Sequence, residues 1–327
     1  MRASTVSVLF LLFISGCSTP TGRVSLESVP SEAGSLSVFF CPHDDCEGAL
    51  LSAVNSSKES VHCAFFDLDL PSLITLLGDK SKNIDVKLVI DEQNYGAVIG
   101  ENVKKDDSSQ YSHNKFCVID GKIVTTGSMN PTNNDAHKNN NNLLVIGSRY
   151  LARNHEDEFS ELWELRFGEG ERVRYPEAYL NGIHIENYFC PEDKCSEKII
   201  ERLSKAEKSI YFMQFSFTDE GIADAMLFNK KAEVIGIFEK RDSAGKYSQY
   251  KRLSGFGLDV FTDSNPYNMH NKVFIVDNQT VITGSMNPSS AGNHKNDENI
   301  LIIDDESIAL EYTAEFFRLL NNASGGD

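Results

Sequence analysis

Basic residues are scarce in this 327-residue chain, in which 31 Lys and Arg stand against 48 Asp and Glu, for a formal net charge of −17. Nucleic-acid binding rests largely on neutralising phosphates with Lys and Arg. The charge balance therefore excludes a protein coated with basic residues, although a local basic site remains possible. Tryptophan is also nearly absent, with 1 residue, while 40% of residues are hydrophobic and 24% are charged. This composition is globular and excludes a disordered, fibrous or polytopic membrane protein.

No hydrophobic run is long enough to span a membrane, and the most prominent apolar run lies at the start of the chain. A positive start, Met1-Arg2, precedes the apolar residues 6–14 and the sequence Ile14-Ser15-Gly16-Cys17. The run has the length of a signal-peptide core rather than of a membrane span. Residues 1–16 are therefore expected to be a signal peptide, and the small pair before Cys17 resembles a prokaryotic lipobox. An ordinary signal peptide cut near Gly16 is the alternative.

Lipidation of Cys17 would make residues 17–34 a flexible leader. It would also hold the exported protein at a membrane, in the cell envelope or on the extracellular face. Export would place the other six cysteines in an oxidising space. Two Cys-Pro-x3-Cys segments share one spacing and predict the local disulfides Cys41–Cys46 and Cys190–Cys195. Zinc is the rival ligand, but each pair supplies only two thiols. Cys63 and Cys117 have apolar neighbours and are expected to be inert core thiols.

The chain repeats itself at a constant offset of 157 residues in the later part of each half, and the order of apolar strand-like and helical segments recurs as well. We expect a first repeat at 35–168, a linker at 169–184 and a second repeat at 185–321. The predicted fold is α/β, with two pseudo-twofold-related repeats. Each would be a mixed β-sheet flanked by helices, and the active site would lie at their interface. The element at 250–263 is expected to have no counterpart in the first repeat.

Both halves carry the pattern His-x-Lys-x4-Asp-x6-Gly-Ser-x-Asn. Its six fixed residues would match by chance roughly once in 10^7 to 10^8 start positions at average usage, so two matches at one offset indicate a functional site. The side chains that we expect in this site are His113, Lys115, Asp120, Ser128 and Asn130 in the first half and His270, Lys272, Asp277, Ser285 and Asn287 in the second.

Residues two apart in a strand share a face, so each imidazole should lie beside an ammonium group. A neutral imidazole can attack phosphorus while a protonated second imidazole donates to the leaving oxygen. Two Lys and two Asn would offset the charge of the phosphoryl oxygens, so neither a metal ion nor another cofactor is required. Asp120 and Asp277 each end an apolar run and enter a turn, which leaves a structural and a chemical role equally open.

The doubled motif resembles that of the phospholipase D superfamily, and the resemblance covers about 36–320. It implies that His113 and His270 are nucleophile and general acid, that the motif Lys and Asn residues bind phosphate, and that Ser128 and Ser285 support that pocket. The resemblance also implies an acidic residue that orients one imidazole, and Glu298 matches it. The counterpart of Glu298 is Asn141, a departure from the family pattern, so the two His should differ in role. We expect Glu298 to reach His113 and to make it the nucleophile.

The leading functional hypothesis is a phospholipase D-type phosphodiesterase that hydrolyses phospholipids at a membrane surface through a phosphohistidine intermediate. A metal-independent exported endonuclease is the first alternative, a phosphatidyltransferase the second, and an inactive binding lipoprotein the third. No obligate protein partner is expected. The nuclease hypothesis predicts a basic lobe around the His pair, made from Lys104, Lys105, Lys138, Lys240, Arg241 and Lys295. The lipase hypothesis predicts exposed apolar residues at its mouth, with Tyr95, Val98, Ile99, Tyr267 and Met269 as candidates.

Overall fold

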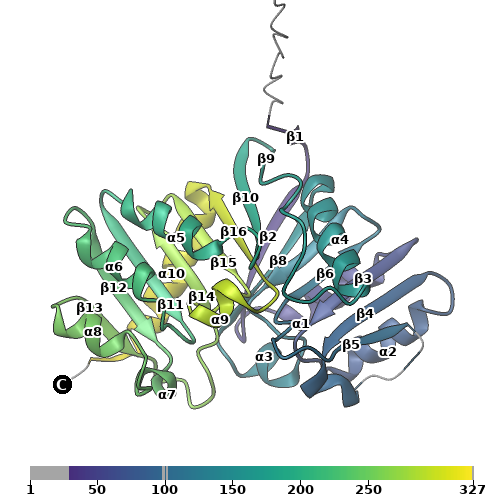
Figure 1. The fold of residues 1–327 in the computed structure, drawn as a ribbon, viewed down its shortest axis with the longest axis horizontal. Helices are drawn as coiled ribbons and strands as arrows, with labels where there is room; N and C mark the ends of the chain where they lie inside the picture. Colours follow the sequence, from purple (N-terminus) through teal and green to yellow (C-terminus); the bar gives the residue numbers. More distant parts are fainter. Residues whose placement is uncertain (1–28, 98–99, 101, 326–327) are drawn as a thin grey trace, which may run out of the picture.

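The computed structural model describes residues 29–97, 100 and 102–325, which form two mixed β-sheets side by side (Figure 1). The expected signal peptide at 1–16 and the lipidated Cys17 lie outside the described residues. In the part of the chain that is described, no helix combines the length and the apolar character needed to cross a membrane.

The first sheet has seven strands in the order β2-β8-β7-β6-β3-β4-β5. The strand β3 pairs in parallel with β4 and antiparallel with β6, so the sheet is mixed. Its strands are β2 (Ser35–Cys41), β3 (Ser60–Phe65), β4 (Asp85–Asp91), β5 (Val103–Asp106), β6 (Lys115–Ile119), β7 (Ile123–Gly127) and β8 (Asn141–Gly147). The helices of this repeat are α1 (Cys46–Asn55), α2 (Pro71–Lys80), the 3-10 helix η1 (Glu92–Ala97), α3 (Asn133–His137) and α4 (Arg149–Trp163).

The second sheet has ten strands in the order β1-β9-β10-β16-β15-β14-β11-β12-β13-β17. Its strands are β1 (Ser31–Glu32), β9 (Glu177–Leu180), β10 (Ile183–Cys190), β11 (Ser209–Gln214), β12 (Glu233–Phe238), β13 (Asp259–Thr262), β14 (Lys272–Val276), β15 (Thr280–Gly284), β16 (Glu298–Asp304) and β17 (Ser324–Gly325). Its helices are α5 (Cys195–Ser204), α6 (Glu220–Phe228), α7 (Lys240–Ser243), α8 (Tyr250–Gly255), α9 (Ser290–His294) and α10 (Glu306–Leu320).

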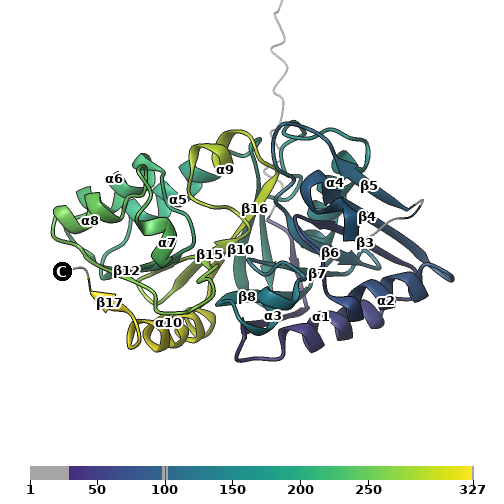
Figure 2. The same cartoon turned by 90° about the horizontal axis from the view of Figure 1, so that it is seen from below.

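The internal repeat of the sequence is a repeat of structure. The bounds of β6, β7, α3, β8 and α4 recur 157 residues later as those of β14, β15, α9, β16 and α10. Figure 2 shows α1 and α2 on one side of the first sheet and α4 on the other, while α10 lies on the side of the second sheet opposite α5 and α6. The predicted fold, two related α/β repeats with helices on both faces of each sheet, is confirmed.

The final helix of each repeat packs its apolar face on its own sheet. Ser148 begins α4 by accepting a hydrogen bond from the Leu151 amide, and Asp305 begins α10 by accepting one from the Ile308 amide. Such caps satisfy backbone donors that the first helical turn leaves unpaired. Buried side chains of both helices belong to one hydrophobic cluster that extends across the two repeats. The repeats are therefore joined by a shared core, which fixes the relative position of their motif strands.

The predicted linker and leader are more ordered than expected. The linker at 169–184 contains β9 and the first residues of β10, and the end of the leader forms β1, which pairs in parallel with β9. The Asn181 side chain also accepts from the Gly34 amide and donates to the Gly34 carbonyl. The strand β9 pairs with the backbone groups that β10 would otherwise leave unpaired at its edge, and β1 pairs in turn with β9.

We expected the element at 250–263 to have no counterpart in the first repeat, and this prediction is only partly correct. The strand β5 pairs with β4 as β13 pairs with β12, so the strand has a counterpart. The helix α8 does not have one among the described residues, where η1 stands between β4 and β5. A short Val-Lys-Lys-Asp strand has too little apolar pattern to be recognised in the sequence.

All six cysteines of the described region are in disulfides. Cys41–Cys46 and Cys190–Cys195 confirm the predicted local pairs. The third disulfide, Cys63–Cys117, corrects the expectation of two inert thiols. Cys63 on β3 lies directly opposite Cys117 on β6, a cross-strand position that an apolar neighbourhood alone does not reveal.

Candidate active site

The two motif histidines precede the strands β6 and β14 and are held by the backbone of the opposite repeat. The His113 amide donates to the Asp297 carbonyl at 3.0 Å, and the His270 amide donates to the Asn140 carbonyl at 2.8 Å. Both imidazoles line one cavity of about 500 Å³ between the repeats. The sequence expectation of a single shared site, with one histidine from each half, is confirmed.

His113 is held by the carboxylate that the sequence predicts. Its Nδ1 lies 2.8 Å from Oε2 of the fully buried Glu298, which also accepts a 2.7 Å hydrogen bond from the Ser285 hydroxyl. Desolvation, followed by the charges of Lys115 and Lys272, lowers the pKa of His113 well below its ordinary value. Burial raises the pKa of Glu298 to about 8. These shifts favour the neutral form of the free imidazole, and because Nδ1 faces Glu298, Nε2 is the nitrogen left available for attack.

His270 has a different set of neighbours. Its Nδ1 lies 3.0 Å from Oδ1 of Asn141, 3.1 Å from the Ser128 carbonyl and 3.4 Å from Oδ2 of Asp135. Burial, then the charge of Lys272, lowers the pKa of His270, and the charge of Asp135 opposes that shift. Desolvation would raise the pKa of Asp135, but the charge of His270 and the hydrogen bonds from Asn139 and Asn130 outweigh it and lower this pKa. A carboxylate therefore faces each imidazole.

Asp135 was missed by the sequence reasoning. The equivalent residue of the second repeat, 157 positions later, is Gly292, so a comparison of the two halves shows no acidic residue repeated at this position. Its position in the first turn of α3 was the available signal, because this helix follows the Gly-Ser-x-Asn segment directly.

The two motif lysines are buried beside the imidazoles. The Lys115 ammonium donates to the backbone carbonyl of His113, and the Lys272 ammonium donates to that of His270. Desolvation lowers the pKa of Lys115 to about 8 and lowers that of Lys272 well below its ordinary value. A bound phosphate would reverse both shifts, because an anion stabilises the charged form of a nearby amine.

Two phenylalanines complete this part of the site. The Phe66 ring stands edge-on to His113 and beneath the Lys115 ammonium, and the Phe215 ring does the same for His270 and Lys272. These contacts fix the direction of each imidazole.

The motif asparagines line the cavity, and the motif serines lie behind its wall. Asn130 gives its backbone N–H and its Nδ2 to Asp135, so its Oδ1 is left without a partner in the described region. Oδ1 of Asn287 is unpartnered there as well. Ser128 and Ser285 accept from backbone amides of β8 and β16, a supporting position that agrees with the role expected for them.

The motif aspartates are structural, which corrects their expected place among the catalytic residues. Asp120 accepts hydrogen bonds from the backbone amides of residues 58–60, and Asp277 accepts them from 207–209. Neither lines the cavity. Both have positive φ, 51° and 55°, at the turns that end β6 and β14. They attach these turns to the starts of β3 and β11, where backbone donors need acceptors.

The lining of the cavity is acidic. Its four carboxylates are those of Asp67, Asp69, Asp135 and Asp242, and none of the described residues that line it is Lys or Arg. The six basic residues expected around a nuclease site are all outside this lining. Lys104, for example, donates to the Trp163 carbonyl and stands over its ring.

The expected apolar mouth is only partly present. Tyr267 is 47% exposed, whereas Met269 is fully buried, so its proposed place at the mouth is wrong. The side chain of Tyr95, and Val98 and Ile99, lie outside the described part of the structure. Tyr111, which the sequence reasoning did not single out, is 42% exposed and lines the cavity.

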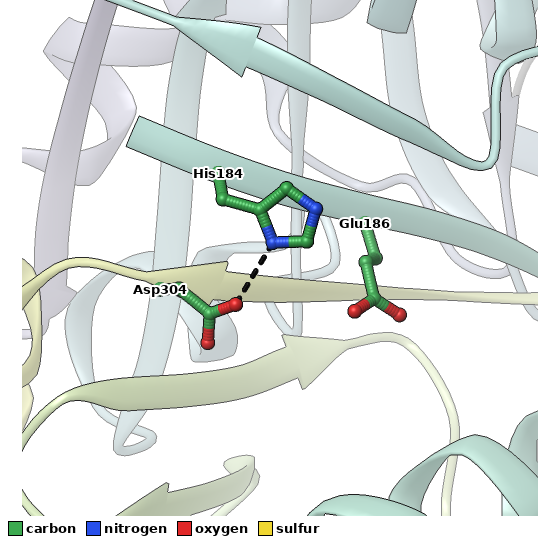
Figure 3. Close-up of side chains that lie close together, drawn as sticks. All are labelled: His184, Glu186 and Asp304. Atoms are coloured by element: carbon green, nitrogen blue, oxygen red, sulfur yellow. Dashed lines mark hydrogen bonds and ion pairs between the residues drawn. The ribbon is translucent and has the colours of Figure 1, made fainter. Parts of the chain in front are cut away.

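A cluster of metal-ligating side chains lies on β10 and β16, outside this cavity. Figure 3 shows His184, Glu186 and Asp304, with His184 Nδ1 2.9 Å from Oδ2 of Asp304. The guanidinium of Arg202 pairs with both carboxylates. It already supplies the positive charge that a metal ion would bring, so the cluster is an ion-pair network.

Both halves of the chain match a known protein family. The family model described as cardiolipin synthase, PLD-like domain, matches residues 50–163 and 199–320, the two halves that carry the motifs. The chain belongs to the phospholipase D superfamily. It is accordingly a phosphodiesterase of the hydrolase class, with one composite site built from two repeats.

Similar proteins are found in distant organisms. The chain is 32% identical over 143 residues to a phospholipase D of Rickettsia typhi, a match covering 42% of this chain and 69% of the relative. It is 31% identical over 135 residues to a mitochondrial cardiolipin hydrolase of Xenopus tropicalis, covering 38% and 64%. The crystal structure of a Haemophilus influenzae phosphatidylserine synthase shares the fold, with a TM-score of 0.67, 13% identity and coverage of 88% and 87%.

Proposed function

We propose that this protein hydrolyses phospholipid phosphodiester bonds through a covalent phosphohistidine intermediate, with His113 as nucleophile and His270 as general acid. The observation that carries the proposal is the single cavity lined by both imidazoles, each with a carboxylate near its Nδ1. With Nδ1 engaged, Nε2 of each ring is the atom that can reach a phosphoryl group.

The reaction has two balanced steps. In the first, Nε2 of His113 forms a bond to phosphorus while the bond to the head-group oxygen breaks, and His270 gives that oxygen a proton. In the second, water attacks phosphorus, His270 takes the proton from water, and the bond to His113 breaks. Phosphatidate and free alcohol are released. Lys115 and Lys272 offset the negative charge of the phosphoryl oxygens in both steps.

The choice of phospholipid over nucleic acid is supported by the lining of the cavity. Four carboxylates line the cavity, and Lys115 and Lys272, buried beside the imidazoles, are not among its lining residues; this acidic lining repels a polyanion. The formal net charge of −17 adds to that repulsion. The names of similar proteins, a phospholipase D and a cardiolipin hydrolase, agree with a lipid substrate.

The test is a direct comparison of substrates with chelator present. Purified protein is incubated separately with phospholipid vesicles and with single-stranded DNA, and phosphatidate release and strand nicking are measured. Phosphatidate release without nicking is expected, and His113→Ala should abolish it. Nicking without phosphatidate release would replace the proposal with the nuclease hypothesis.

We also propose that the protein is exported and held at the membrane by lipidated Cys17. Three disulfides in the described region support an oxidising location, because such bonds are rare in reducing compartments. Labelling of growing cells with a fatty-acid analogue should mark the wild type and not Cys17→Ser. An unlabelled wild-type protein would favour the ordinary signal peptide.

A further inference from the structure

The two local disulfides occupy equivalent places behind the active site, one in each repeat. Cys41 is the last residue of β2 and lies directly opposite Asn141 on β8. Cys190 is the last residue of β10 and lies directly opposite Glu298 on β16. Asn141 and Glu298 are side chains that contact the two motif imidazoles at Nδ1. Each disulfide is therefore one strand away from a side chain that orients an imidazole.

Each disulfide also contacts the methionine in its repeat's Gly-Ser-Met-Asn segment. Sγ of Cys41 lies 3.7 Å from Sδ of Met129, and Sγ of Cys190 lies 3.8 Å from Sδ of Met286. These four side chains are at most 4% exposed. A close-packed interior has no void that absorbs a displaced side chain, so a change at the disulfide reaches the methionine.

The residues on either side of these methionines belong to the site. The Ser128 carbonyl lies 3.1 Å from Nδ1 of His270, and the backbone of Ser285 is hydrogen bonded to His113. The motif asparagines that follow the methionines line the cavity. A shift of either methionine would therefore move a backbone group that contacts an imidazole and a side chain of the cavity wall.

The residue after the second cysteine of each pair contacts the short helix that follows the motif. Oε2 of Glu47 lies 2.7 Å from Nε2 of His137, the last residue of α3. The Ser196 amide donates to Oδ1 of Asn293 in α9 at 2.8 Å. The helix α3 also carries Asp135, the carboxylate that faces the imidazole of the second repeat. Each disulfide turn thus contacts the site through a strand, a methionine and a short helix.

The bond itself joins the end of a strand to the start of a helix. Cys46 is the first residue of α1, and Cys195 is the first residue of α5. Without the bond, the two side chains of a pair are held by non-covalent contacts alone and can adopt other rotamers. A misplacement of about 1 Å at the reacting groups can lower a rate about 10^2-fold. A small relaxation of either turn is therefore enough to be measured in the chemical step.

We infer that the two Cys-Pro-x3-Cys disulfides are positioning elements of the active site, each for a different imidazole. The bond Cys190–Cys195 acts on the nucleophile through Glu298. The bond Cys41–Cys46 acts on the general acid through Asn141 and the helix α3. This inference rests on the proposed phosphohistidine mechanism and its assignment of roles. Full turnover then requires both bonds, which form in an oxidising space.

The experiment compares two double variants, Cys190→Ala/Cys195→Ala and Cys41→Ala/Cys46→Ala, at a temperature where both are folded. Bis(p-nitrophenyl) phosphate has a leaving group that needs no proton, whereas the head-group alcohol of a phospholipid needs one. Loss of the first bond should slow the first turnover of both substrates by about 10- to 100-fold. Loss of the second should leave the first turnover of the p-nitrophenyl ester within about twofold of wild type and lower kcat on phospholipid about 10- to 100-fold. Stopped-flow release of p-nitrophenol and release of phosphatidate measure these rates.

A control variant destabilises the fold without touching either turn. Leu77 is a buried residue of α2 that does not line the cavity. Leu77→Ala leaves a cavity in the core and lowers stability, while its rates on both substrates should stay near those of the wild type. Denaturant unfolding of all three variants shows whether rate and stability change together.

Each outcome decides one proposal. Double variants with wild-type rates overturn the positioning role and leave phospholipid hydrolysis intact. Losses that are equal on both substrates for both bonds also overturn it, because a merely structural effect does not depend on the leaving group. Effects exchanged between the two bonds contradict the assignment of each bond to its imidazole. A wild type that nicks single-stranded DNA and cleaves no phospholipid removes the proposed substrate, and DNA then replaces the phospholipid in this comparison.

Discussion

The two imidazoles of the active site are unequal because different groups face their Nδ1 atoms. Glu298 bonds His113 directly at 2.8 Å, whereas Asn141 is the closest side chain to His270 and Asp135 stands at 3.4 Å. A bonded carboxylate stabilises the positive charge that an attacking imidazole acquires. The weaker contact leaves His270 readier to give up its proton once it is charged. This asymmetry is the reason for assigning the nucleophile to the first repeat.

Trapping of the intermediate tests this assignment. In bis(p-nitrophenyl) phosphate the leaving group needs no proton, so the first step does not depend on the general acid. His270→Ala should release one equivalent of p-nitrophenol and then stop as a phosphoenzyme, with steady-state turnover lowered about 10^2- to 10^4-fold. His113→Ala should give neither burst nor phosphoenzyme. The opposite pattern, observed by rapid quench and intact-mass measurement, would exchange the two roles.

Asp135 is expected to act through His270 as a positioning residue. Asp135→Asn keeps the shape of the side chain but removes the charge that favours protonated His270, so kcat on phospholipid should fall about 10- to 100-fold. The loss should be much smaller on a p-nitrophenyl ester, and the acidic and basic limbs of the pH profile should move closer together. Equal losses on both substrates would indicate a purely structural role.

Asp120→Asn is the matched control for that variant. Its carboxylate accepts four backbone hydrogen bonds far from the chemistry, so stability should fall by about 1–3 kcal/mol while kcat of the folded enzyme stays unchanged. The pair also shows what a motif can reveal. The spacing selected His113 and Lys115, which the structure brings to one site, but it could not separate a chemical aspartate from a structural one. That distinction depends on which backbone amides the fold brings near.

At the scale of elements, the repeats use different chemistry at equivalent positions of their sheets. Cys63 and Cys117 are directly opposite on β3 and β6, and Phe212 and Phe274 are directly opposite on β11 and β14. The first repeat therefore has a disulfide where the second has a pair of aromatic rings, 6.1 Å apart between centroids. Comparing the two halves at these positions was the signal that could have predicted the bond, because a covalent link and a ring pair can fill the same cross-strand space.

Removal of this disulfide should cost more than removal of a local one. Cys63–Cys117 closes a loop with a sequence separation of 54, whereas Cys41–Cys46 has a separation of 5. Loop-closure entropy predicts a loss of about 4 kcal/mol for Cys63→Ala/Cys117→Ala and about 2 kcal/mol for Cys41→Ala/Cys46→Ala. Denaturant unfolding without reductant measures both values. Equal losses would mean that packing rather than chain entropy dominates.

The elements that the sequence did not reveal share a physical property. The strands β1 and β9 are short strands at one end of the second sheet, and β5 has two lysines among its four residues. The conformation of these strands depends on pairing with a neighbouring strand, and their own sequences show little periodic apolar pattern. The long helices α4 and α10, by contrast, have an apolar period and N-caps that are local features of the sequence.

At the scale of the whole molecule, the repeats meet through buried polar side chains related by the pseudo-twofold axis. Asn142 and Asn299 each accept from a threonine of the other repeat, Thr283 and Thr126 respectively. Asn299 also donates to Asn114, which in turn donates to Glu158. Such a network holds the two motif strands in one register, since each unpaired member would cost free energy.

Glu158 is the point at which the symmetry of this interface fails. Its counterpart, Glu315, is paired with Arg318, but the residue equivalent to Arg318 in the first repeat is Glu161. Desolvation, followed by the charges of Asp297, Glu192 and Glu161, raises the pKa of Glu158 well above its ordinary value. The folded state therefore holds a proton that the unfolded chain has lost at neutral pH. Stability must fall as pH rises above the unfolded pKa of about 4.3.

Glu158→Gln removes this loss while keeping an acceptor for Asn114. The free energy of unfolding at neutral pH should increase by about 1–2 kcal/mol, and the gain should vanish near pH 4, where the unfolded carboxyl is also protonated. Glu315→Gln is the matched control and should not stabilise, because it leaves Arg318 without its partner. Thermal and denaturant unfolding of both variants at the two pH values measure the difference. A Glu158→Gln protein no more stable than the wild type at neutral pH would show that solvent or a counter-ion reaches this carboxylate between the repeats.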